Sequence, residues 1–312
     1  MIYCNQTVVA ERLVSSMNRT ERMDIFLKKL KEDSSEYSEL NTTGYTLEEK
    51  RDVIRSLMNI RMPREAAPEL LTIQDEYLQE ELAEKGIVSL ADIPTVLEQY
   101  GASRSAVGEK SIGRAGIEAS YMDRISIWQG DITRLKVGAI VNAANSQMLG
   151  CFVPCHRCID NAIHSAAGMQ LRAECHHIIS EKRMRYGREY EEPVGTATLT
   201  KAYNLPCDYV IHTVGPIVYG ELTEALCQDL RNCYAAVLEC CVTHGIRSVA
   251  FCCISTGEFH FPNEEAAKIA LATVNDFVKT HEDFFERIIF NVFKECDLEI
   301  YRKLVSDYCM YT

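Results

Sequence analysis

The sequence predicts an α/β protein with a largely parallel or mixed β-sheet covered by helices, preceded by a smaller all-helical domain. Residues 1 to about 100 place apolar side chains at three- and four-residue spacings, which is typical of amphipathic helices. From about residue 121, short runs rich in β-branched and aromatic residues alternate with longer helical patterns. The stretch 101–120 between them is rich in Gly and Ser and reads as a linker.

The helical part divides into several expected helices. Thr46 followed by Glu48 and Glu49 predicts a helix start, and Gly86 predicts a helix end. We therefore expect an N-terminal helical domain over residues 1–110 and a sheet-containing domain over 111–312. The apolar periodicity predicts N-terminal helices over 8–17, 25–40, 48–60 and 68–86.

The second part alternates between strands and helices. Ligands of such sheets bind at the carboxyl ends of the strands, in the loops that lead to helices, so these loops are the expected site. The expected strands lie within 124–130, 138–145, 195–203, 208–215, 248–255 and 287–293. The expected helices lie at about 160–181, 221–244, 263–279 and 297–309.

Composition narrows the class of protein. The chain has 312 residues, 47% of them hydrophobic, and a net charge of -12, which disfavours a nucleic-acid partner because such a protein needs a basic surface. No apolar run approaches the roughly 18–20 residues that span a bilayer, so no membrane partner is expected. The N-terminus lacks the features of a secretory signal. We expect a cytoplasmic, reducing location.

Three loops that follow expected strands carry polar residues. Gly130–Thr133 is a weak signal, because a Gly-Asp pair is more often a turn than a site. Asn142 and Asn145 close an apolar strand and need specific hydrogen-bond partners if buried. Ser255–Phe259 precedes a helix that begins near Pro262, and its backbone N–H groups could bind a phosphate. The chain lacks the glycine patterns of dinucleotide-binding and P-loop sites.

A cluster of Cys and His follows the second of these loops. Thirteen of the 14 cysteines lie after residue 150, and several of them sit in apolar patterns typical of a core. Cys151, Cys155, His156 and Cys158, in contrast, fall within eight residues. Such a cluster in a reducing compartment points to a metal. Cys155 and Cys158 alone could form a structural zinc pair or a redox pair, although a thioredoxin-like context is missing.

Six motifs in order resemble the macrodomain, the ADP-ribose-binding module with a three-layer α/β/α sandwich. They are GDIT, VNAANS, IDNAIHSAAG, GTATLT, IHTVGP and ISTGEFHFP, and together they span about residues 123–300. Most macrodomains have a run of glycines where this chain reads GCFVPCHRCIDNAIH. That segment resembles the zinc-dependent macrodomains associated with class M sirtuins, as do LMNIRMP and LLTIQDEYLQEE in the helical part.

The resemblance implies one zinc ion per chain, held by Cys151, His156 and Cys158, with Cys155 left out. Three ligands in one loop favour an open coordination position, which is typical of catalytic zinc. Asp160 is expected to cap the following helix, to assist hydrolysis, or to do both.

The resemblance also assigns the ADP-ribose contacts. Asp131 would accept a hydrogen bond from the adenine amino group, and Ile132 would present a backbone N–H to the ligand. Asn145 would orient the distal ribose and act in catalysis. The third loop would bind the diphosphate and the distal ribose through Ser255, Thr256, Gly257, Glu258 and Phe259.

The implied activity is zinc-dependent removal of mono-ADP-ribose from protein side chains, with Asp or Glu as the expected attachment residue. The resemblance suggests a lipoyl-carrier protein, modified by a class M sirtuin, as the substrate. One alternative is a module that binds ADP-ribose without cleaving it, with zinc only fixing the loop. Another is deacetylation of O-acetyl-ADP-ribose in the same pocket. A purely structural zinc protein is the least favoured interpretation.

Overall fold

The chain folds into two compact units. The structure is a computed structural model that describes residues 17–100, 122–281 and 283–311. The first unit contains the described residues up to Gly86, together with Met148–Glu189 and Tyr203–Leu205. The second contains Ile87–Gln147 and the later segments Tyr190–Ala202 and Pro206–Thr312, as far as they are described. Within the described ranges, no helix is both long and apolar enough to cross a membrane.

The first unit is helical. Apolar residues from α2, α3 and α4 meet in one buried cluster, in which the rings of Phe26 and Tyr77 lie 5.4 Å apart. This cluster explains the three- and four-residue spacing of the sequence, because each helix turns one face to it. Among the described residues of this unit, the helices are α2 (Arg19–Glu32), α3 (Leu47–Ile60), α4 (Pro68–Lys85), α7 (Ile159–Ala167) and α8 (Met169–Tyr186).

Two helix ends agree with the sequence signals. The Thr46 side chain accepts a hydrogen bond from the Glu49 backbone N–H, and the Glu49 carboxylate accepts one from the Thr46 N–H. This capping box satisfies N–H groups that have no partner within helix α3. Gly86 ends α4 with φ of 77°, a conformation that favours glycine.

Two predicted helices were wrong in extent. The helix expected over 25–40 ends at Glu32, because Arg61 holds the Asp33 carboxylate and Arg64 holds its carbonyl, which turns the chain. The single helix expected over 160–181 is two helices, α7 and α8. They are separated at Gly168, whose φ is 97°.

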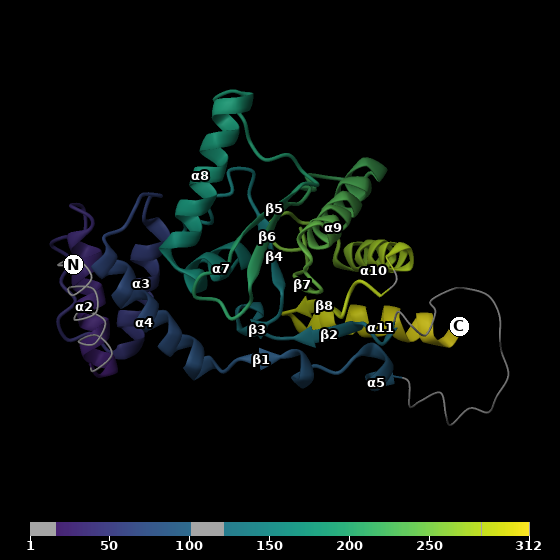
Figure 1. Ribbon diagram of the computed structural model, residues 1–312, viewed down its shortest axis with the longest axis horizontal. Helices are drawn as coiled ribbons and strands as arrows, with labels where there is room; N and C mark the ends of the chain where they lie inside the picture. The colour runs from purple at the N-terminus through teal and green to yellow at the C-terminus, as the bar shows by residue number, and fades with distance from the viewer. Residues whose placement is uncertain (1–16, 101–121, 282, 312) are drawn as a thin grey trace. The chain divides into compact units, whose positions relative to one another are not determined.

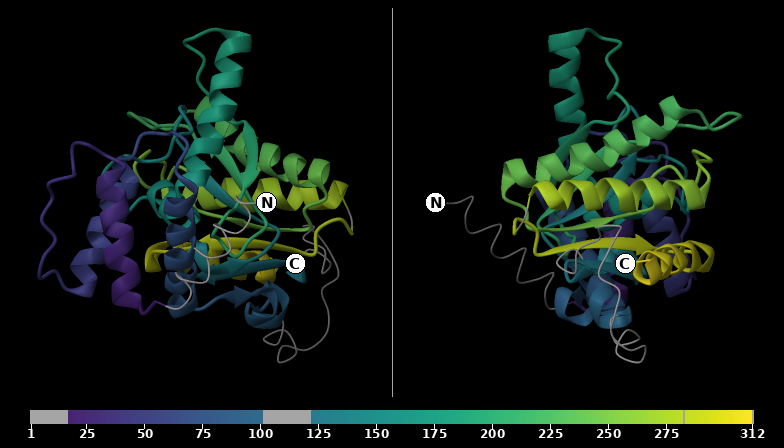
Figure 2. Two further views of the ribbon diagram at one scale, coloured as in Figure 1. Left: turned by 60° about the vertical axis from the view of Figure 1, so that its left-hand side comes forward. Right: turned by 90° about the vertical axis from the view of Figure 1, so that its right-hand side faces the viewer.

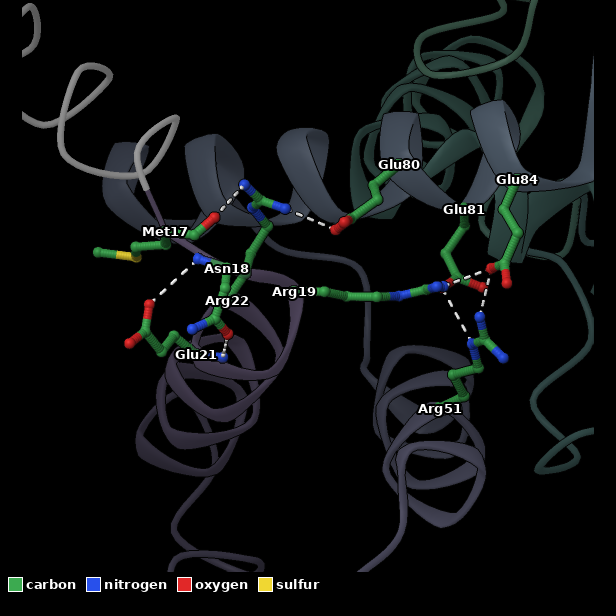
Figure 3. A network of polar contacts seen from close by, with 9 residues as sticks. All are labelled: Met17, Asn18, Arg19, Glu21, Arg22, Arg51, Glu80, Glu81 and Glu84. Atoms are coloured by element: carbon green, nitrogen blue, oxygen red, sulfur yellow. Dashed lines mark hydrogen bonds and ion pairs between the residues drawn. The ribbon is translucent and has the colours of Figure 1, made fainter.

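Ion pairs join helices α2, α3 and α4, as Figure 3 shows. Arg19 on α2 and Arg51 on α3 both reach Glu81 and Glu84 on α4. The hydrogen bond from Arg19 lowers the pKa of the Glu84 carboxyl below its ordinary value. Such partly exposed pairs contribute little stability each, so the apolar cluster is the main force that holds the helices together.

The second unit contains a six-stranded mixed sheet in the order β2-β8-β7-β4-β6-β5 (Figure 1). The strands pair in parallel except for β5, which is antiparallel to β6. A separate parallel pair joins β1 (Val88–Ser89) to β3 (Leu135–Lys136). The sheet strands are β2 (Ile125–Gln129), β4 (Ala139–Ala144), β5 (Ala197–Lys201), β6 (Tyr209–Val214), β7 (Ser248–Phe251) and β8 (Arg287–Val292).

Helices cover this sheet as the sequence predicts. Helices α9 (Glu224–His244) and α10 (Asn263–Thr280) lie side by side in Figures 1 and 2. They connect β6 to β7 and β7 to β8, and right-handed crossovers in the same direction place both on one face. Helix α11 (Glu295–Tyr311) packs on β2 and β8, and the short α5 (Val96–Tyr100) also reaches β2. The predicted α/β sandwich with a mixed sheet is confirmed.

The expected strands all form, each within its predicted range. The domain boundary expected at residue 110 and the linker 101–120 lie outside the described residues, as does most of the helix expected over 8–17. The described segment Val88–Tyr100 already packs in the unit that holds the sheet. The helical unit also includes Met148–Glu189, which comes from the second half of the sequence.

Candidate functional site

The carboxyl ends of the parallel strands gather the expected ADP-ribose contacts in the second unit. Strands β2, β8, β7, β4 and β6 run in the same direction, so the loops that follow them leave the same edge of the sheet. Asp131 follows β2, Asn145 follows β4, and Ser255–Phe259 follows β7. The fold therefore brings these three loops to one edge.

The loop after β2 is shaped by its own side chains. Asp131 caps the short 3-10 helix Ile132–Arg134, with its Oδ1 accepting from the Thr133 N–H at 3.0 Å and from its hydroxyl at 2.6 Å. Asn291 at the end of β8 donates to the Gly130 carbonyl at 2.9 Å. These bonds fix the Asp131 carboxylate at the sheet edge, beside the buried Ile132.

The two asparagines of the second loop have different roles. Asn142 is fully buried, and its amide donates to Nδ1 of His212 at 3.1 Å. His212 Nε2 in turn lies 3.0 Å from the Thr200 hydroxyl. Burial lowers the pKa of His212 to about 3, so the ring is neutral and can both accept from Asn142 and donate to Thr200. Asn142 therefore ties strands together, whereas the half-buried Asn145 shapes the turn by accepting from Gln147 N–H at 3.1 Å.

The third loop is held at both ends and exposed in the middle. Ser255 is buried with φ of 64°, and its carbonyl accepts from the Phe261 N–H at 3.0 Å. Gly215 allows this loop to approach the loop after β6, because a Cβ at Gly215 would lie 2.0 Å from Ser255 Oγ. Gly257 and Glu258 are exposed, and a Cβ at Gly257 would meet no atom within 4 Å. The middle of the loop thus offers exposed backbone to a ligand.

The expected metal ligands lie together in the first unit. The ligand atoms of Cys151, His156 and Cys158 all lie within 4.8 Å of one another. Cys151 Sγ and His156 Nδ1 are 3.6 Å apart. Tetrahedral zinc, with Zn–S bonds of about 2.3 Å and Zn–N bonds of about 2.0–2.1 Å, would separate such atoms by about 3.6 Å. The donor types and their spacing therefore fit a zinc ion.

The surroundings of Cys158 favour its neutral thiol. Burial raises its pKa to about 12, although the backbone N–H of Asn161, 3.4 Å from Sγ, acts in the opposite direction. A buried thiol of this kind becomes a thiolate only when a cation compensates its charge.

Cys155 stands apart from this group. Its Sγ lies 3.3 Å from the Ser56 hydroxyl and 3.4 Å from the Asp52 carbonyl, on helix α3. It is not part of the donor cluster that Cys151, His156 and Cys158 form. This geometry favours the three-ligand set over a pair made of Cys155 and Cys158.

Asp160 does not cap helix α7, which corrects one of its two expected roles. The N-cap is Cys158, whose sulfur accepts the Asn161 N–H that an N-cap side chain normally binds. Asp160 lies in the first turn, is buried, and has Oδ1 3.5 Å from Nε2 of His164. Its expected part in hydrolysis stays a prediction.

Three residues contact the loop of residues 151–158 without any sequence signal for these contacts, although Asn59 lies in the LMNIRMP segment that carries part of the resemblance. Arg55, Asn59 and Arg172 all form hydrogen bonds to residues 151–161, although the first two are about a hundred positions away. Such contacts between distant segments produce no local motif, so the sequence could not reveal them.

Comparisons with known proteins identify the class that this fold and site define. A model of the macro domain family matches residues 141–270. The chain is 47% identical over 259 residues to a protein-ADP-ribose hydrolase of Treponema medium, covering 83% of this chain and 88% of the relative. It is 39% identical to a protein-ADP-ribose hydrolase of Staphylococcus aureus, covering 83% and 85%.

A solved structure agrees with this match. The Trypanosoma brucei macrodomain in complex with ADP-ribose is 28% identical, with a TM-score of 0.57, and the match covers 78% of this chain and 93% of that one. The fold is thus that of an ADP-ribose-binding α/β module. The chain belongs to the macrodomain family.

Proposed function

We propose that the protein hydrolyses the bond between mono-ADP-ribose and a modified protein side chain, with zinc as its cofactor. The observation that carries the proposal is the Cys151, His156 and Cys158 donor group. It occurs in a macrodomain that is 47% identical to a relative named protein-ADP-ribose hydrolase.

The loops at the sheet edge would bind the ADP-ribose. Asp131 accepts a hydrogen bond from the adenine amino group, and Ile132 presents its backbone N–H to the ligand. The exposed backbone of Ser255–Glu258 donates to the diphosphate, as N–H groups before a helix do in other anion sites. Phe259 packs against the distal ribose, and Asn145 orients its hydroxyl groups.

The loop of residues 151–158, which we call the metal loop, would supply the groups that cleave the bond to the protein side chain. When bound, zinc supplies a Lewis acid that polarises an oxygen and lowers the pKa of water. Cys151, His156 and Cys158 hold the ion in place. Asp160, held near His164, orients the attacking water and accepts its proton. For an aspartate or glutamate ester, the water oxygen would bond to the anomeric carbon of the ribose while the bond from that carbon to the carboxylate oxygen breaks. ADP-ribose would keep the new hydroxyl group, the side chain would leave as a free carboxylate, and the proton taken up by Asp160 would pass to solvent.

The test measures zinc content and ADP-ribose release together. The substrate is a carrier protein with ADP-ribose on an acidic side chain, treated with and without chelator. We expect one zinc per chain and a release that chelator abolishes. Cys158→Ala should lose the zinc and the release of ADP-ribose. Cys155→Ala should keep both properties, because the Cys155 thiol contacts Ser56 on α3 instead of the proposed ligands.

Other outcomes select other functions. Zinc binding without release from any modified protein would favour a module that only binds ADP-ribose. Faster turnover of O-acetyl-ADP-ribose than of the modified protein would favour a deacetylase. Full activity of Cys158→Ala would overturn the zinc mechanism.

A further inference from the structure

The metal loop, residues 151–158, contains no helix or strand, yet it must hold three ligand atoms at fixed positions. We infer that Arg55 and Asn59 of helix α3 are positioning residues that keep this loop in its metal-binding shape. The N-terminal helices would then be part of the support of the metal centre. This inference rests on the zinc site of the proposed function.

Arg55 acts through Asn161, which is fully buried. The guanidinium donates to Asn161 Oδ1 from Nη2 at 2.7 Å and from Nε at 3.2 Å. The same Nη2 donates to the His156 carbonyl at 3.1 Å. One arginine therefore holds both the backbone of a metal ligand and the side chain that organises the rest of the loop.

Asn161 distributes this support across the loop. Its amide donates to the Val153 carbonyl at 3.0 Å and the Cys151 carbonyl at 3.5 Å. Its backbone N–H donates to Cys158 Sγ at 3.4 Å. Arg55 and Asn161 together thus reach the backbone or sulfur of all three proposed ligands.

Asn59 holds the middle of the loop. Its Oδ1 accepts from the Cys155 N–H at 3.0 Å, and its amide donates to the Ser165 hydroxyl at 2.8 Å on α7. Cys155 has φ of 52°, a left-handed conformation that costs free energy for a residue other than glycine. The hydrogen bond that Asn59 accepts from the Cys155 N–H stabilises this turn directly before His156.

Arg172 fixes the end of α3 to the same loop. Its Nη1 donates to the carbonyls of Met58, Asn59 and Arg61 at 3.1, 2.6 and 2.8 Å. Its Nη2 lies 3.4 Å from the Cys151 carbonyl, and its guanidinium lies 4.4 Å from the centre of the Phe152 ring. Helix α3 is therefore held where Arg55 and Asn59 can reach the loop.

Contacts of this kind orient metal ligands before the metal binds. Removing such outer contacts typically lowers metal affinity about 10–100-fold. We expect Arg55→Met and Asn59→Ala each to weaken zinc binding by about this factor, measured by competition with a chromophoric chelator. The visible absorption spectrum of the Co²⁺-loaded protein should also change, since it reports ligand geometry. Arg55→Lys keeps the charge but not the forked donor, so its affinity should fall between those of the wild type and Arg55→Met.

Arg51→Met is the matched control. Arg51 lies one turn before Arg55 on the same helix and pairs with Glu81 and Glu84 instead of the loop. It should keep the zinc affinity and cobalt spectrum of the wild type. A general weakening of the helical unit would affect Arg51→Met and Arg55→Met alike, and that result would overturn the inference.

The outcomes separate this inference from the proposed function. If the wild-type protein binds no zinc, the zinc mechanism itself fails. If the wild type binds zinc, Cys158→Ala does not, and Arg55→Met retains wild-type affinity, only the positioning role fails. If Arg55→Met does not fold, Arg55→Lys and Asn59→Ala test the inference instead. Wild-type zinc affinity in both variants would overturn it.

Discussion

At the scale of single residues, two kinds of polar side chain occupy the motifs of this protein. Asp131 and Asn145 lie at the sheet edge, where a ligand can reach them. Asn142 and His212 are buried within the sheet and bond to each other. A polar residue in a motif is therefore not always a site residue, because some form the hydrogen bonds that allow polar groups to be buried.

The buried neutral His212 predicts how stability depends on pH. Its folded pKa of about 3 lies below the unfolded value of about 6.5, so the unfolded state takes up the proton first. Its effect on the free energy of unfolding is absent above pH 6.5, and it destabilises the protein as the pH falls from 6.5 toward 3. The slope is at most about 1.4 kcal/mol per pH unit.

Urea unfolding of the wild type and of His212→Gln at pH 7, 6 and 5 checks this prediction. The variant should be less stable at pH 7 but lose less stability on acidification. His176→Gln, which changes an exposed histidine, should keep the wild-type slope. Equal slopes for the wild type and His212→Gln would contradict the prediction.

At the scale of elements, the loop between β7 and α10 combines rigid ends with an exposed centre. The buried Ser255 and the backbone bond between Val218 and Phe259 hold it against the loop after β6. Gly257 and Glu258 remain exposed between these fixed points. A preorganised loop binds an anion without the entropic cost of ordering its backbone.

Because the centre of this loop is exposed, a substitution there should weaken ADP-ribose binding without lowering the stability of the protein. Gly257→Val should fold normally, because a Cβ there meets no atom within 4 Å, yet its branched side chain would occupy the space over the exposed backbone. We expect ADP-ribose affinity, measured by titration calorimetry, to fall at least about tenfold, or about 1.4 kcal/mol. Gly220→Val, another glycine with open space around it, should bind normally. Wild-type affinity in Gly257→Val would remove this loop from the proposed binding site.

At the scale of the whole molecule, the order of segments in the chain differs from their grouping in space. The metal loop, α7 and α8 come between two strands of the sheet but pack with the N-terminal helices. Hydrogen bonds that Arg55 donates to the His156 carbonyl and Asn59 accepts from the Cys155 N–H account for part of this grouping. The helical part thus gains a residue-level connection to the proposed metal site.

Hydrogen exchange provides a test at this scale. Removing zinc with a chelator should speed deuterium uptake in residues 151–161 and in the last turn of α3, because ligands, loop and helix end are joined by hydrogen bonds. Uptake in α9 of the other unit should not change. Equal acceleration in α9, or no change in the loop, would contradict this prediction.

The sequence by itself determined the α/β class, all strands of the six-stranded sheet, the start of α3 after Thr46 and the end of α4 at Gly86. These features depend on local periodicity and on residues a few positions apart, so a single sequence reveals them. The Cys and His cluster was equally visible, because its donors fall within eight residues.

Only the tertiary structure decided the roles of residues whose partners are distant in sequence. It turned the Cys155 thiol toward α3 and joined Arg55 to Asn161. It also ended α2 at Glu32, where arginines after α3 hold Asp33. The physical reason is the same in each case: a hydrogen bond between distant segments forms only after packing brings them together, and no local pattern records it.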